Sequence, residues 1–99
     1  LGDAAPHGGG STDLSAIGLA LVERKVRALF VAEGAYIPGG FDDETGEVFL
    51  FEREPHGRFQ GPELADGFVR AALAQDADVF ELPAEKIPGD SGIAALYRY

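Results

Sequence analysis

The chain has 99 residues, 17 of them acidic and 8 basic, so its formal net charge at pH 7 is −9. This length predicts one domain, and the negative charge opposes binding to a phosphate backbone, so we expect no direct contact with nucleic acid. The absence of cysteine excludes disulfides and thiolate metal sites. No apolar run approaches the roughly 20 residues of a membrane span, so we expect no membrane contact and a cytoplasmic location.

The chain starts with small residues, and Pro6 and three consecutive glycines predict a flexible lead-in over residues 1–10. Because it starts with Leu1 and contains no methionine, we expect it to be a domain of a longer protein. Residues 11–13 are good N-caps, and the apolar residues after them recur at the spacing of one helical face, which predicts a helix ending near Lys25. The apolar run Val26–Ala32 then predicts a strand that is buried on both faces.

Glycines and Pro38 end this strand and open a different kind of segment. A turn at residues 44–46, followed by an apolar run, predicts a hairpin-like insert over about residues 36–53. A second helix is expected over residues 62–76, because proline suits a first helical turn and an apolar stripe follows it. The pattern after it predicts a short strand over Asp78–Leu82, a loop with two prolines, and a last strand over residues 92–99.

The two strands joined through the second helix should be parallel neighbours, and the short connection before the last strand allows antiparallel pairing. We expect the two helices to cover opposite faces of the sheet. Residues 11–99 therefore predict an α/β fold, as a single three-layer α/β/α sandwich with a mixed central sheet and a hairpin-like insert.

One short motif near the end of the chain suggests catalysis. Gly89-Asp90-Ser91-Gly92 matches the sequence around the nucleophile of chymotrypsin-like proteases, which also need a histidine base, a buried aspartate and oxyanion donors. The two histidines, His7 and His56, lie in Gly/Pro-rich segments with no sign of a fixed partner. A tight turn before the last strand is the favoured interpretation, so no catalytic residue is assigned. A small serine hydrolase using Ser91 remains an alternative, and it requires a histidine within about 2.6–3.2 Å of the serine.

Two segments carry a resemblance to a known family. Residues 23–34 read Glu-Arg-Lys-Val-Arg-Ala-Leu-Phe-Val-Ala-Glu-Gly, and residues 92–99 read Gly-Ile-Ala-Ala-Leu-Tyr-Arg-Tyr. These segments resemble the buried strand and the closing strand of the C-terminal domain of the archaeo-eukaryotic peptide-release-factor and pelota superfamily, especially its bacterial branch. The resemblance covers most of residues 11–99, and fold-forming residues carry it.

The resemblance implies a docking role, because the equivalent domain contacts a translational GTPase or neighbouring domains. The Gly-Gly-Gln loop that hydrolyses peptidyl-tRNA in the family is absent from this chain. Relatives often hold a zinc ribbon where the insert lies, and since this chain has no cysteine, a metal-free hairpin and no cofactor are implied. The function implied is a non-catalytic protein-interaction domain of a release-factor-like or ribosome-rescue-like translation protein. The related kink-turn RNA-binding ribosomal proteins suggest RNA binding as a further alternative, although their basic surface is missing here.

The insert is the candidate contact for a protein partner. Its residues place charge beside apolar side chains, as in a charged rim around an apolar anchor. The predicted contact residues are Tyr36, Ile37, Phe41, Asp42, Asp43, Glu44 and Glu47. The partner would be a translational GTPase, the ribosome or neighbouring domains of the same protein. The acidic run lacks the spacing of a dedicated calcium loop, so no metal site is predicted.

Overall fold

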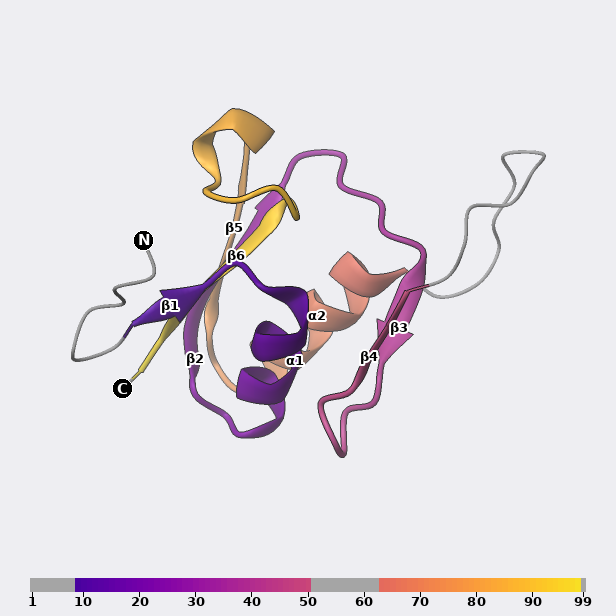
Figure 1. Cartoon of the computed structure of the whole chain (residues 1–99). Coiled ribbons are helices and arrows are strands. Elements are labelled where there is room, and N and C mark those ends of the chain that lie inside the picture. The colour runs from indigo at the N-terminus through magenta and orange to yellow at the C-terminus, as the bar shows by residue number, and fades with distance from the viewer. Residues whose placement is uncertain (1–8, 51–62, 99) are drawn as a thin grey trace.

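The computed structural model of the chain describes residues 9–50 and 63–98. The helices and strands are β1 (Gly10–Ser11), α1 (Leu14–Val22), β2 (Val26–Ala32), β3 (Gly39–Phe41), β4 (Val48–Leu50), α2 (Leu64–Ala74), β5 (Asp78–Leu82), the 3-10 turn η1 (Ala84–Lys86) and β6 (Ile93–Tyr97). They form three layers, in which the helices lie between a four-stranded sheet and the β3–β4 hairpin (Figure 1). The predicted hairpin-like insert is therefore confirmed.

The four-stranded sheet has the order β1-β6-β2-β5. Strand β2 pairs in parallel with β5 and antiparallel with β6, which confirms the predicted mixed sheet and α/β class. Both β2 and β5 have the bounds that the sequence predicts. Strand β1 was not predicted. The sequence analysis places Gly10 in the flexible lead-in, whereas in the structure Gly10 pairs with Leu96 of β6.

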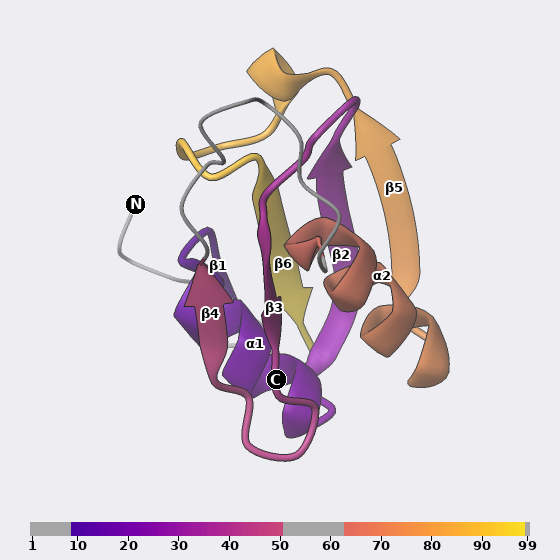
Figure 2. The ribbon, with the colours of Figure 1, turned by 90° about the vertical axis from the view of Figure 1, so that its right-hand side faces the viewer.

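Both helices lie on the same face of the sheet, whereas the sequence predicts opposite faces (Figure 2). Ile17 of α1 and Phe68 of α2 share one fully buried cluster with Leu29 of β2. The strand order explains the difference. Strands β1, β2 and β5 point the same way and follow one another in one direction across the sheet, so two right-handed crossovers place both helices on one side.

The hairpin packs directly on the helices. The ring of Phe41 meets the ring of Phe68 edge-on, with centroids 5.1 Å apart and planes at 81°. On α1 the contact is made by backbone, because a Cβ added to Gly18 would lie 2.7 Å from the carbonyl oxygen of Gly46. Gly46 itself has a φ of +83°. Glycine at both positions therefore allows the hairpin turn to rest on the helix.

Two polar side chains join the layers. Glu63 is the N-cap of α2, and its carboxylate accepts hydrogen bonds from the backbone N–H groups of Ala65, Asp66 and Ile37, which ties the loop before β3 to this helix. Gln75 at the end of α2 is 4% exposed. Its amide donates to the Leu21 carbonyl at 2.8 Å and accepts from the Val26 N–H at 3.3 Å, so it connects the ends of both helices to β2.

Candidate functional site

The four acidic residues predicted as contacts, Asp42, Asp43, Glu44 and Glu47, lie together at the tip of the hairpin. Asp42 is half-buried, and its Oδ1 accepts hydrogen bonds from the N–H groups of Glu44 and Thr45 at 2.8 and 3.3 Å. Its backbone also bonds to Glu47 and Gly46, at 2.8 and 2.7 Å. These bonds fix the turn, and they leave the carboxylates of Asp43, Glu44 and Glu47 exposed to solvent. We call the four residues Asp42, Asp43, Glu44 and Glu47 the acidic tip.

The three apolar residues predicted beside these acids do not form one surface with them. Ile37 and Phe41 are half-buried and pack against the helices. Tyr36 is 55% exposed, but it precedes β3, whereas the acidic tip follows β3. The structure thus gathers the four acids and turns two of the three proposed anchor residues inward.

The structure exposes an apolar residue at the hairpin that the sequence prediction did not assign. Phe49 of β4 is 43% exposed and pairs opposite Gly40. The preceding residue, Val48, points toward α1, where its Cγ2 lies 2.8 Å from the position of a Cβ on Gly18. Because side chains alternate along a strand, Phe49 points away from the helices. This alternation was the signal in the sequence that could have identified it.

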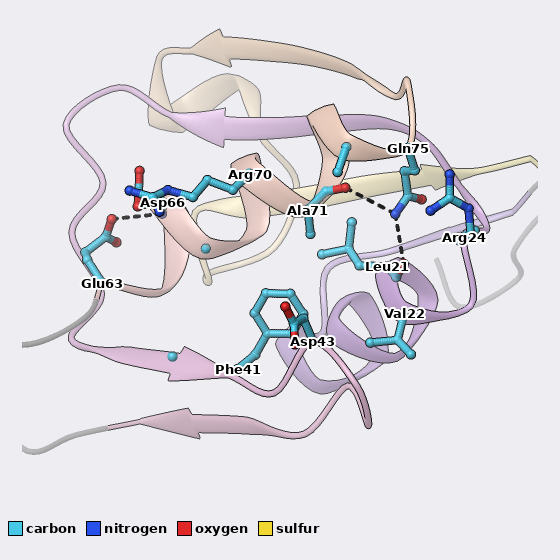
Figure 3. A pocket seen from close by; sticks show the side chains of 13 residues that line it. Leu21, Val22, Arg24, Phe41, Asp43, Glu63, Asp66, Arg70, Ala71 and Gln75 are labelled. Atoms are coloured by element: carbon cyan, nitrogen blue, oxygen red, sulfur yellow. Dashed lines mark hydrogen bonds and ion pairs between the residues drawn. The ribbon is translucent and has the colours of Figure 1, made fainter.

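A cavity of about 710 Å³ lies between the hairpin, α2 and the end of α1 (Figure 3). Phe41 and Leu21 contribute apolar lining, and charged side chains from all three elements surround it. Asp66 and Arg70 form an exposed ion pair at 3.0 Å on its α2 side. Asp43 lines the cavity and also belongs to the acidic tip, so the two features are continuous.

Ser91 has a structural role in the described part of the chain. Its Oγ lies 2.9 Å from the carbonyl oxygens of Thr12 and Ile93 and accepts from the Ile93 N–H at 3.2 Å. Gly89 and Gly92 have φ of +81° and +83°, as the predicted turn requires. The Ser91 hydroxyl therefore donates its proton to backbone carbonyl oxygen within the fold. His7 and His56, the histidines of the hydrolase alternative, lie outside the described residues.

We therefore expect Ser91→Ala to lower the free energy of unfolding by about 1 kcal/mol, because the Thr12 and Ile93 carbonyls lose a donor. Urea denaturation followed by circular dichroism measures the change. Ser15→Ala is the matched control, since Ser15 is exposed on α1 and alanine favours a helix. An unchanged stability, together with loss of hydrolysis of an ester probe, would instead support the nucleophile.

Other chemistry has little basis in the described residues. Residues 9–50 and 63–98 contain no group of three or more His, Cys, Asp or Glu placed to hold a metal ion. Burial raises the pKa of the Tyr97 phenol above its usual value, so the phenol keeps its proton near neutral pH. Over the same two ranges, no helix is long and apolar enough to cross a membrane.

Basic residues gather beside the α1–β2 turn, at the opposite end of α1 from its N-cap. Two of them have partners within the fold. Lys25 pairs with Glu23 at 3.0 Å, and the guanidinium of Arg98 donates to the Gln75 carbonyl at 2.7 Å. This group is too small to provide the extended basic surface that RNA binding requires.

Comparison with protein-family models and with curated proteins gives no relative from which a function could be transferred. No protein-family model matches the chain, and no curated protein is significantly similar to it. The resemblance to the release-factor and pelota superfamily therefore stays a prediction.

Proposed function

We propose that this chain is a non-catalytic protein-interaction domain of a release-factor-like or ribosome-rescue-like translation protein that works in the cytoplasm. The acidic tip is the observation that carries the interaction role. Its three exposed carboxylates stand on a turn that hydrogen bonds already hold in place. A preformed loop loses little conformational entropy when a partner binds. The resemblance of residues 23–34 and 92–99 supports the translational setting.

The charge of the tip defines the chemistry of the partner surface. A chain with a net charge of −9 that concentrates carboxylates on one turn attracts a basic surface and repels an acidic one. The cavity beside Asp43 offers space for a side chain of the partner, since both the charged Asp43 and the apolar Phe41 line it. A lysine or arginine side chain satisfies both features, because its stem is apolar and its end is cationic.

Charge reversal at the tip tests this role. The variant is Asp43→Lys, Glu44→Lys and Glu47→Lys in the full-length protein, and Asp42 is kept because its carboxylate holds the turn. We expect association with purified ribosomes or with a translational GTPase to slow about 10- to 100-fold at low salt, and the salt dependence of the association rate to flatten. Surface plasmon resonance over a series of salt concentrations measures both.

A second triple variant separates the tip from the overall charge. Glu33, Glu81 and Glu85 are exposed and lie outside the hairpin, so their reversal to lysine changes the net charge by the same amount. This control should retain most of the association rate. Equal losses in both variants would contradict a role for the tip. If the unaltered protein binds neither ribosomes nor the GTPase, the translational setting is wrong.

A further inference from the structure

The face of the four-stranded sheet that points away from the helices is apolar and partly open. Phe30 of β2 and Phe80 of β5 stack on it, with ring centroids 5.3 Å apart and planes at 18°. Phe80 is 45% exposed and Leu96 of β6 is 36% exposed. Within residues 9–50 and 63–98 no helix or strand covers this face (Figure 1). Ile87, which follows η1, packs against one end of it.

The sequence of β2 is typical of a strand whose two faces are both buried. Leu29 and Val31 point toward the helices, whereas Ala28, Phe30 and Ala32 point toward the open face. A strand with one face in water normally alternates apolar with polar residues, and continuous apolar strands occur where both faces are buried. Apolar patches of a few hundred Å² on a protein surface are often functional.

A groove of about 680 Å³ runs over this face. Its floor includes Phe30, Leu82 and Leu96. One end is closed by the loop after η1, and the bond from Ser91 Oγ to the Thr12 carbonyl holds that loop against the start of α1. The Gly-Asp-Ser-Gly turn therefore shapes the groove.

The size of this face decides what can occupy it. Four strands about 4.8 Å apart span roughly 19 Å, and five strand residues span roughly 17 Å, so the face offers on the order of 300 Å². A stable dimer buries about 800 Å² on each partner, so a second copy of this sheet would bury too little. One α-helix is about 10 Å wide, and roughly three turns of it cover 17 Å.

We propose that this groove binds one amphipathic α-helix of about three turns from a basic partner. Its apolar side chains would cover Phe30, Phe80 and Leu96. Its basic side chains would be attracted by the net charge of the whole chain, which is −9, and would have Asp13 at the groove as a neighbour. A second copy would bring nine further negative charges, which opposes self-association. The helices lie between this sheet and the hairpin that carries the acidic tip (Figures 1 and 2), so this binding is independent of the proposed function.

The test uses a fluorescently labelled peptide of 14 leucine and lysine residues, in which the leucines recur at helical spacing. Fluorescence anisotropy with the whole chain measures its dissociation constant, and amide chemical shifts locate the contact. We expect saturable binding of one peptide, with the largest shifts in β2, β6 and β5. A peptide of the same composition with strictly alternating leucine and lysine, which favours a strand, should bind at least about tenfold more weakly.

Matched variants separate the groove from general attraction to an acidic protein. Phe80→Ser should weaken binding about tenfold, whereas Phe49→Ser should leave it unchanged, because Phe49 is similarly exposed on the hairpin. Phe80 stacks on Phe30 beside the groove, whereas Leu96 lines the groove itself, so Leu96→Ser gives a second variant if Phe80→Ser alters the circular dichroism spectrum. Equal binding of both peptides, or equal losses for the Phe80 and Phe49 variants, would overturn the proposal.

Two further measurements complete the test. The Asp43, Glu44 and Glu47 reversal variant should still bind the helical peptide with the same pattern of shifts, so failure of the acidic tip and failure of the groove can be told apart. Analytical ultracentrifugation of the chain alone should show a monomer. A dimer that Phe80→Ser dissociates would show that a second copy occupies the groove, and the proposal would be wrong.

Discussion

Replacing Gln75 with leucine is expected to lower the free energy of unfolding by about 1–3 kcal/mol. The Gln75 side chain is almost fully buried and bonds to the Leu21 carbonyl and the Val26 N–H. Leucine fills a similar volume but leaves the Val26 N–H without an acceptor and removes one donor from the Leu21 carbonyl, which keeps the Arg24 N–H at 3.1 Å. Each unsatisfied buried group costs about 1–3 kcal/mol. The loss should therefore exceed that of an ordinary surface substitution.

Chemical denaturation at pH 7 measures this loss. Leu73→Ala is a suitable control, because Leu73 lies two residues earlier, within α2, and is 59% exposed, so little buried surface is lost. It should change the stability by less than about 1 kcal/mol. A neutral or stabilising effect of Gln75→Leu would show that the two helix ends do not depend on this side chain.

The same substitution at two helix glycines is expected to have opposite effects. Gly18→Ala should destabilise the protein by about 1–3 kcal/mol, because its Cβ would lie 2.7 Å from the Gly46 oxygen and 2.8 Å from a Val48 methyl group. Gly67→Ala should stabilise it by up to about 1 kcal/mol, since alanine is the better helix former. Its Cβ would meet only the ring of Phe41, at 3.5 Å.

Thermal and urea unfolding of the two variants provide the comparison. Both variants gain helix propensity, so the difference between them isolates the contact of α1 with the hairpin turn. Gly18→Ala should also increase hydrogen exchange in β3 and β4, because the hairpin loses its support. If both variants are stabilised, the close backbone approach at Gly18 is not a constraint on the fold.

Several parts of the fold could be predicted because local patterns determine them. The apolar run of β2 is bounded by Lys25 on one side and by Gly34 on the other, and its predicted bounds agree with the structure. Asp13, one of the predicted N-caps, caps α1 by accepting from the Ala16 N–H at 2.9 Å. The parallel pairing of β2 with β5 follows from the helix that joins them.

The placement of the helices could not be predicted, because it depends on one short strand. Gly10 and Ser11 have no strand pattern of their own, and β1 exists only through its pairing with β6. Without β1 the direction of the first crossover is undefined. The sequence therefore allowed helices on either face, and the prediction of opposite faces was wrong.

The candidate site was predicted in part for a similar reason. Charge is a local property, so the run from Asp42 to Glu47 identified the acidic tip. Whether an aromatic residue points inward or outward depends on what lies beneath it. Phe41 meets Phe68, which comes from a distant part of the chain, and Phe49 has no such partner described.

The central position of β6 has a consequence for the order in which this protein folds. Among the described strands β6 comes last in sequence order, but it lies between β1 and β2, and within residues 9–50 and 63–98 it is the strand that pairs with β1. A growing chain can pair β2 with β5 before residues 93–97 have been made, whereas one side of β2 remains an unpaired edge until they arrive. Pairing between such distant segments slows folding, and an exposed apolar edge favours aggregation in the meantime. During synthesis the chain therefore stays vulnerable until its last strand is available.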